Sequence, residues 1–148
     1  MPAPRKIAVI GNSLPRRCGI ATFSTDLQRA IANSRPNLQA GIVAMTDHDQ
    51  TYDYPASVVL QIKDDSIAEY VSAAAFLNAG GFDIVSLQHE FGIFGGEAGA
   101  HILELLSRLT MPVVTTLHTV LAAPSAAQRA AMERIVEISS KVVVMADK

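Results

Sequence analysis

The chain has 148 residues, of which 49% are hydrophobic and 18% are charged, and its formal net charge is −2. This composition is typical of one globular domain with its own core, and it excludes a disordered chain, a non-specific nucleic-acid binder and a polybasic tether. A single cysteine excludes a disulfide framework, and the lack of any apolar run of about 18 residues excludes a transmembrane span. We therefore predict a cytoplasmic protein, for which peripheral membrane contact stays open.

Short apolar runs rich in β-branched residues alternate along the chain with longer stretches of helical period. The predicted strands are Lys6–Ile10, Gly41–Met45, Ser57–Ile62, Ile84–Leu87, Val113–Leu117 and Val142–Met145. Such alternation is typical of a parallel sheet covered by helices on both faces. We therefore predict a three-layer α/β/α Rossmann-like domain with strand order 3-2-1-4-5-6, in which the first and fourth strands are neighbours.

Helices are predicted between most of the strands. The first carries Ile20, Phe23, Leu27 and Ile31, and the second carries Ile67, Tyr70, Val71, Ala74 and Leu77, all at helical spacing. Capping boxes are predicted where Ser66 precedes Glu69 and where Ser125 precedes Gln128. The segment "GEAGAHILELLSRL" is expected to be one helix, and "TDHDQTYDYPA" an exposed loop.

The loop after the first strand, Gly11–Gly19, contains neither G-x-G-x-x-G nor G-K-[ST]. Gly19 opens a helix, where a missing Cβ lets a phosphate or sugar approach the backbone, or it serves only as a turn glycine. Arg16 and Arg17 could pair with a phosphate, or they form a solvated surface. For Cys18 a small buried apolar role is expected over that of a nucleophile.

The loop after the fourth strand, "QHEFGIFGGEAG", places His89 and Glu90 before Gly95 and Gly96. The His-Glu pair could act as acid and base or bind sugar hydroxyls, and the glycines would allow a ligand to come close. No H-E-x-x-H is present and His101 falls inside the predicted helix, so we predict no metal site.

The loop after the fifth strand begins "TTLHTVL" and carries His118 where an apolar strand ends. Carboxyl ends of parallel strands meet at one edge of the sheet, which is where ligands bind in open α/β folds. His118 is therefore expected to face a crevice shared with the first two loops.

Together "PRRCGIATFSTDL", "LQHEFGIFGG" and "TTLHT" resemble the N-terminal domain of glycosyltransferase family 4. The resemblance implies a GT-B fold, in which two Rossmann-like domains face each other and the C-terminal one holds most of the nucleotide sugar. It implies that Gly19, with Arg16 or Arg17, faces the donor phosphates, and that the His89–Glu90 loop lies towards a sugar or glycolipid acceptor. His118 would lie at the transfer point, with no cofactor and no metal.

The resemblance assigns residues 1–148 to the acceptor-side domain, with the donor-binding domain outside this chain. The ending "KVVVMADK", a strand without a closing helix, favours the same interpretation and predicts weak binding of nucleotide sugars by this chain alone. A flavodoxin-like or receiver-like binding module is the first alternative, although Gly11-Asn12-Ser13 replaces the acidic cluster of a receiver. A nicotinamide-dependent oxidoreductase is the second, disfavoured because "IVAMT" ends the second strand without an acidic residue.

Overall fold

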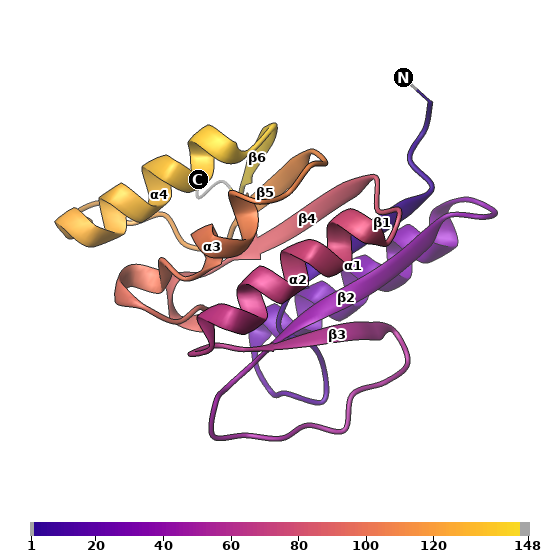
Figure 1. The fold of residues 1–148 in the computed structure, drawn as a ribbon, viewed down its shortest axis with the longest axis horizontal. Coiled ribbons are helices and arrows are strands. Elements are labelled where there is room, and N and C mark those ends of the chain that lie inside the picture. The colour runs from indigo at the N-terminus through magenta and orange to yellow at the C-terminus, as the bar shows by residue number, and fades with distance from the viewer. Residues whose placement is uncertain (1, 146–148) are drawn as a thin grey trace.

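The computed structural model describes residues 2–145 and has a six-stranded sheet, all parallel, in the order β3-β2-β1-β4-β5-β6 (Figure 1). The strands are β1 (Lys6–Gly11), β2 (Gln39–Thr46), β3 (Val58–Lys63), β4 (Ile84–His89), β5 (Val113–Leu117) and β6 (Lys141–Val144). The predicted fold class and strand order are confirmed. In the centre, β1 pairs with β4 so that Ile10 lies opposite Leu87.

Helices cover both faces of this sheet (Figure 1). On one face lies α1 (Gly19–Ser34), whose Leu27 and Ile31 pack against Val9 and Ile42. On the other face lie α2 (Ile67–Ala79), α3 (Ile102–Leu106) and α4 (Ala126–Ile138), over the larger apolar core. All crossovers join parallel strands, so the carboxyl ends of the strands meet at one edge.

Both predicted caps begin helices, but only one is a reciprocal capping box. At α4 the Ser125 hydroxyl accepts from the Gln128 N–H, and the Gln128 side chain accepts from the Ser125 N–H. At α2 the Ser66 hydroxyl accepts from the Glu69 N–H, whereas the Glu69 carboxylate accepts from the Lys63 N–H instead. Glu69 therefore ties the start of α2 to the end of β3.

The predicted long helix over "GEAGAHILELLSRL" is wrong. The chain forms two single 3₁₀ turns, η1 (Phe91–Ile93) and η2 (Glu97–Gly99), before the five-residue α3. Ala98 has φ 53° and Gly99 has φ 73°, and a right-handed helix cannot pass through residues with positive φ. His101 consequently lies before α3, where its ring meets Tyr70 edge to face.

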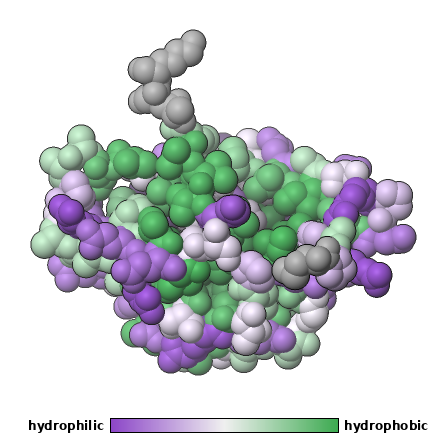
Figure 2. Space-filling view, turned by 90° about the horizontal axis from the view of Figure 1, so that it is seen from above, coloured by the Kyte–Doolittle hydropathy of each residue, from purple (hydrophilic) through white to green (hydrophobic). Residues whose placement is uncertain are grey.

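Strand β6 forms one edge of the sheet and is little covered by other elements. Val142, Val143 and Val144 are 37%, 46% and 55% exposed, and Val120 in the loop after β5 is exposed as well. The space-filling view shows a broad hydrophobic area on the face seen from above (Figure 2).

None of the helices in residues 2–145 has the length and the apolar composition that a membrane span needs.

Candidate functional site

His118 follows directly on β5, at the carboxyl edge of the sheet. Its backbone N–H donates to the carbonyl of His89 at 2.9 Å, which ties the third motif loop to the second. Its ring meets the ring of Phe23 on α1 edge to face, with centroids 4.7 Å apart. His118 therefore lies between the loop after β4 and the first turns of α1, as the sequence predicts.

Gln88, the next-to-last residue of β4, is fully buried beside His118. Its amide Oε1 lies 2.9 Å from His118 Nε2, and its Nε2 donates to the hydroxyl of Ser86 at 3.0 Å. Gln88 is not among the site residues predicted from the sequence. Its place one residue before the His-Glu pair, in a strand that alternates between faces, is the signal that could have found it.

His89 is fully buried, and neither ring nitrogen has a hydrogen-bond partner among the described residues. Its ring is stacked on Phe94 at 5.8 Å and meets Phe91 edge to face at 4.9 Å. Burial lowers the pKa of His89 to about 4, with a further contribution from His118. The expected contact between the His89 side chain and a ligand is corrected accordingly: this side chain belongs to the core.

Glu90 is half-buried and caps η1, where its Oε2 accepts from the Gly92 N–H at 2.7 Å. Two effects act on the pKa of His118: burial lowers it, and the negative charge of Glu90 raises it. Burial is the larger effect, so the pKa of His118 lies below its ordinary value. Near neutral pH the site thus contains a neutral imidazole close to a carboxylate.

Gly95 and Gly96 have packing roles in this loop. A Cβ on Gly95 would lie 1.9 Å from the Asp64 carbonyl oxygen, and one on Gly96 would lie 2.5 Å from the His101 ring. Gly96 also has φ 80°, and the Gly95 N–H donates to the Tyr70 hydroxyl. Both positions therefore require glycine for the loop to pack against its neighbours.

Replacing Gly95 with alanine is expected to destabilise the protein by about 3 kcal/mol, because a backbone atom blocks the new methyl group. For a chain of this size the melting temperature should fall by roughly 6–12 °C, measurable by thermal unfolding. Gly19→Ala is the matched control, since a Cβ at Gly19 would meet nothing within 4 Å. Equal melting temperatures for the two variants would contradict the packing role of Gly95.

The first turn of α1 is capped by Cys18. Its sulfur accepts from the Ala21 N–H at 3.3 Å and from the Asn12 side-chain amide at 3.4 Å. The half-buried Cys18 is thus a helix cap, not the fully buried apolar residue that was expected. Within residues 2–145 the N–H groups of Gly19 and Ile20 donate to no residue, so they can bind an anion at the helix N-terminus.

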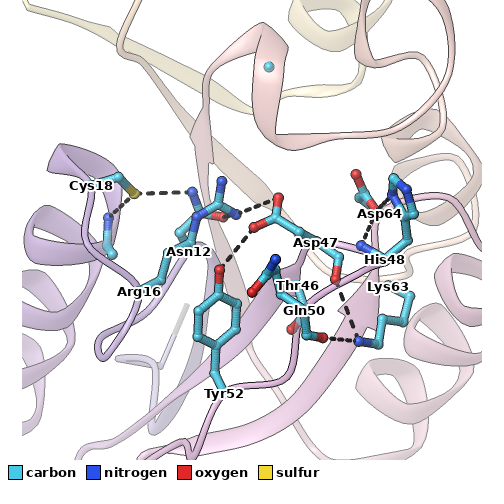
Figure 3. Close-up of polar contacts among 12 residues, drawn as sticks. Asn12, Arg16, Cys18, Thr46, Asp47, His48, Gln50, Tyr52, Lys63 and Asp64 are labelled. Carbon is cyan, nitrogen blue, oxygen red and sulfur yellow. Dashed lines mark hydrogen bonds and ion pairs between the residues drawn. The ribbon is translucent and has the colours of Figure 1, made fainter.

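The two arginines of the first loop differ in their surroundings. Arg16 Nη1 lies 3.2 Å from Asp47 Oδ1 and 3.3 Å from Asn12 Oδ1, so it already has an anionic partner. Tyr52 donates to the other oxygen of Asp47, and Figure 3 shows the three side chains converging. Arg17 is exposed and has no polar partner in the part of the chain that the structure describes. Of the two, Arg17 is the one left to meet a phosphate.

The loop after β2 is held in place by its tyrosines. Besides the bond from Tyr52 to Asp47, the Tyr54 hydroxyl lies 2.6 Å from the Thr46 hydroxyl. β2 ends at Thr46, so no acidic residue ends this strand, and Asp47 follows directly after it. Because Arg16 and Tyr52 occupy both oxygens of Asp47, the carboxylate is engaged within the protein.

One group of potential metal ligands occurs among residues 2–145, and it comprises His48, Asp64 and Asp65. His48 and Asp65 are exposed, and Asp64 Oδ1 accepts from the His48 N–H at 2.8 Å and lies 3.0 Å from His48 Nδ1. The hydrogen bond to Asp64 raises the pKa of His48. These contacts account for the cluster without an ion.

An apolar cavity of about 110 Å³ lies between the loop after β4, the loop after β5 and α4. It is lined by Phe91 and Leu117, the residues that follow Glu90 and precede His118, and by residues of the next loop and of α4. A closed apolar cavity of roughly 150 Å³ can bind benzene, so this one is suited to a small apolar group. It adjoins the two polar residues that the motifs place at the site.

Comparison with known proteins gives no family for this chain. No protein-family model matches the sequence, and no curated protein matches it either. A solved structure described as a lipopolysaccharide outer core galactosyltransferase, WaaB, in its apo form is similar, with 16% identity over 74% of this chain. That match has a TM-score of 0.47 and covers 32% of the other chain, so this chain spans about a third of its length.

Proposed function

We propose that this chain is the N-terminal, acceptor-side domain of a glycosyltransferase that moves a sugar from a nucleotide sugar to a sugar or glycolipid acceptor without a metal ion. One observation carries the proposal: His118 lies at the carboxyl edge in contact with α1 and bonded to the backbone of His89. The three loops whose sequences resemble glycosyltransferase family 4 therefore meet around one side chain. A second domain, facing this edge, would hold most of the nucleotide.

On the donor side, the proposal assigns the N-terminus of α1 to the diphosphate. In the transfer, the bond between the anomeric carbon and the diphosphate breaks, and its electron pair leaves with the diphosphate. The free N–H groups of Gly19 and Ile20 and the positive end of a 16-residue helix would stabilise this developing charge. The Arg17 guanidinium would add countercharge, which is the role that a metal ion has elsewhere.

On the acceptor side, the proposal assigns Glu90 and His118 to hydroxyl groups. The acceptor oxygen forms the new bond to the anomeric carbon, and its proton passes to an oxygen of the departing diphosphate. A carboxylate and a neutral imidazole both accept hydrogen bonds from hydroxyls, and the apolar cavity beside Phe91 and Leu117 would suit an apolar part of an acceptor.

The test is a screen of the full-length protein against nucleotide sugars and acceptors, with release of nucleoside diphosphate as the readout. Transfer that persists in excess EDTA is the expected result. The Gly19→Ala variant should keep its melting temperature but turn over more slowly, because the new methyl group faces the open space assigned to the diphosphate. Binding of a nicotinamide cofactor with no transfer of any sugar would favour the oxidoreductase alternative and contradict the proposal.

A further inference from the structure

We propose that Gln88 is a positioning residue that holds His118 with its proton on Nε2, so that Nδ1 is the ring nitrogen presented to the substrate. The catalytic meaning of this assignment rests on the proposed function, but the arrangement itself does not. It adds to the site a residue that the motif resemblance did not assign.

Both the nitrogen and the oxygen of the Gln88 side-chain amide form hydrogen bonds. In this structure its Nε2 donates to the Ser86 hydroxyl at 3.0 Å, and its Oε1 lies 2.9 Å from His118 Nε2. In this orientation of the amide its oxygen faces His118 and can only accept a hydrogen bond, which assigns the donor role to His118 Nε2. In the neutral imidazole the other nitrogen, Nδ1, then carries the free lone pair.

Packing holds this pair in one geometry. Gln88 is fully buried, and a Cβ on Gly11 would lie 3.1 Å from its Cβ and 2.7 Å from the Ser24 hydroxyl on α1. Glycine at that point of β1 therefore lets the amide and α1 lie close to the strand. On its other side, the His118 ring meets the Phe23 ring edge to face, with the ring centroids 4.7 Å apart.

The second nitrogen of His118 remains available. No residue between 2 and 145 bonds to its Nδ1, and this atom is not among the fully buried polar atoms that lack a partner. Nδ1 is therefore accessible to solvent as a hydrogen-bond acceptor. Such an acceptor suits a sugar hydroxyl and does not suit a phosphate oxygen, which needs a donor or a cation.

The charged and titratable groups around His118 agree with a neutral ring. Burial lowers its pKa, and Glu90, on the loop after β4, acts in the opposite direction to a smaller extent. His89, at the end of β4, is itself neutral near pH 7 because burial lowers its pKa to about 4. From α1 the residue facing the ring is the uncharged Phe23.

The tautomer can be read directly by ¹⁵N NMR of the histidine side chains in the full-length protein at pH 7.5. We expect His118 to show the Nε2–H form in the wild type and a mixture of both forms in Gln88→Met, which keeps the length of the side chain. Gln88→Glu, which retains the acceptor, should restore the Nε2–H form and raise the pKa of His118. Ser86→Ala, which frees the amide to turn over, should weaken the preference.

A wild-type spectrum with the proton on Nδ1, or an unchanged His118 tautomer in Gln88→Met, would overturn the assignment. In steady-state transfer assays Gln88→Met should lower kcat by about 10- to 100-fold with little change in KM, as for other residues that orient a reacting group. A loss of less than twofold, with the tautomer released, would refute the positioning role. If no nucleotide sugar is turned over at all, the proposed function fails, while the spectra still decide the tautomer.

Discussion

His118→Ala is expected to lower kcat of the full-length enzyme by about 10²–10⁴-fold, the usual contribution of a positioned group that takes or holds a proton in the transition state. The side chain is half-buried at the edge of the sheet, and its contacts are one hydrogen bond to Gln88 and the ring of Phe23. Its removal therefore costs little packing, so the melting temperature should fall by only a few degrees. Steady-state kinetics and thermal unfolding of the same preparations provide the measurement.

His48→Ala is the matched control for that experiment. His48 is exposed on the loop after β2, where Asp64 is its partner, and it has no place in the proposed transfer. Its loss should leave kcat unchanged. A tenfold change in rate corresponds to about 1.36 kcal/mol of barrier. A decrease in kcat of less than about threefold in His118→Ala would therefore mean that His118 is not a catalytic residue.

The second large effect concerns His89 and the pH dependence of stability. Burial lowers its pKa from 6.5 to about 4, so the unfolded chain binds this proton more readily than the folded protein. Its contribution to stability is therefore fully present above pH 6.5 and is lost as the pH falls towards 4. Between pH 7 and pH 5 the free energy of unfolding should decrease by about 2 kcal/mol from this residue alone.

His89→Leu isolates that contribution, because leucine fills a similar space between Phe91 and Phe94 and does not titrate. Urea unfolding of both proteins at pH 7 and pH 5 gives the comparison, and the loss on acidification should be smaller in the variant. Equal losses in the two proteins would mean that His89 is protonated in the folded state, which its burial between two aromatic rings opposes.

The sheet was predictable because buried parallel strands are short apolar runs, and their alternation with helices leaves few topologies. The break in the helix predicted before α3 could not be predicted, because an Ala-Gly pair does not indicate that Ala98 adopts φ 53°. The packing of Gly95 against the Asp64 carbonyl decides the path of that loop, and this contact joins segments far apart in the sequence.

For the site, the place of His118 followed from its position at the end of a strand. The orientation of the His89 side chain could not be predicted in the same way. The strand was expected to end at Leu87, whereas β4 extends to His89, and side chains alternate between the two faces along a strand. Gln88 thus faces α1, and His89 faces the core with Val85 and Leu87. Arg16 was one of two candidates for a phosphate contact. Its pairing with Asp47 was not predicted, because Asp47 lies in another loop and contacts between loops cannot be read from local sequence.

The central position of β1 has a consequence for the synthesis of this chain. β1 leaves the ribosome before both of its partners, and the second of them, β4, starts only at Ile84. Ribosomes add about 5–20 residues per second, so one edge of β1 stays open for several seconds while β2, β3 and α2 emerge. During that time the growing chain exposes the backbone of a strand that is fully buried at Ala8, Val9 and Ile10 in the finished fold, and an open strand edge of this kind favours aggregation.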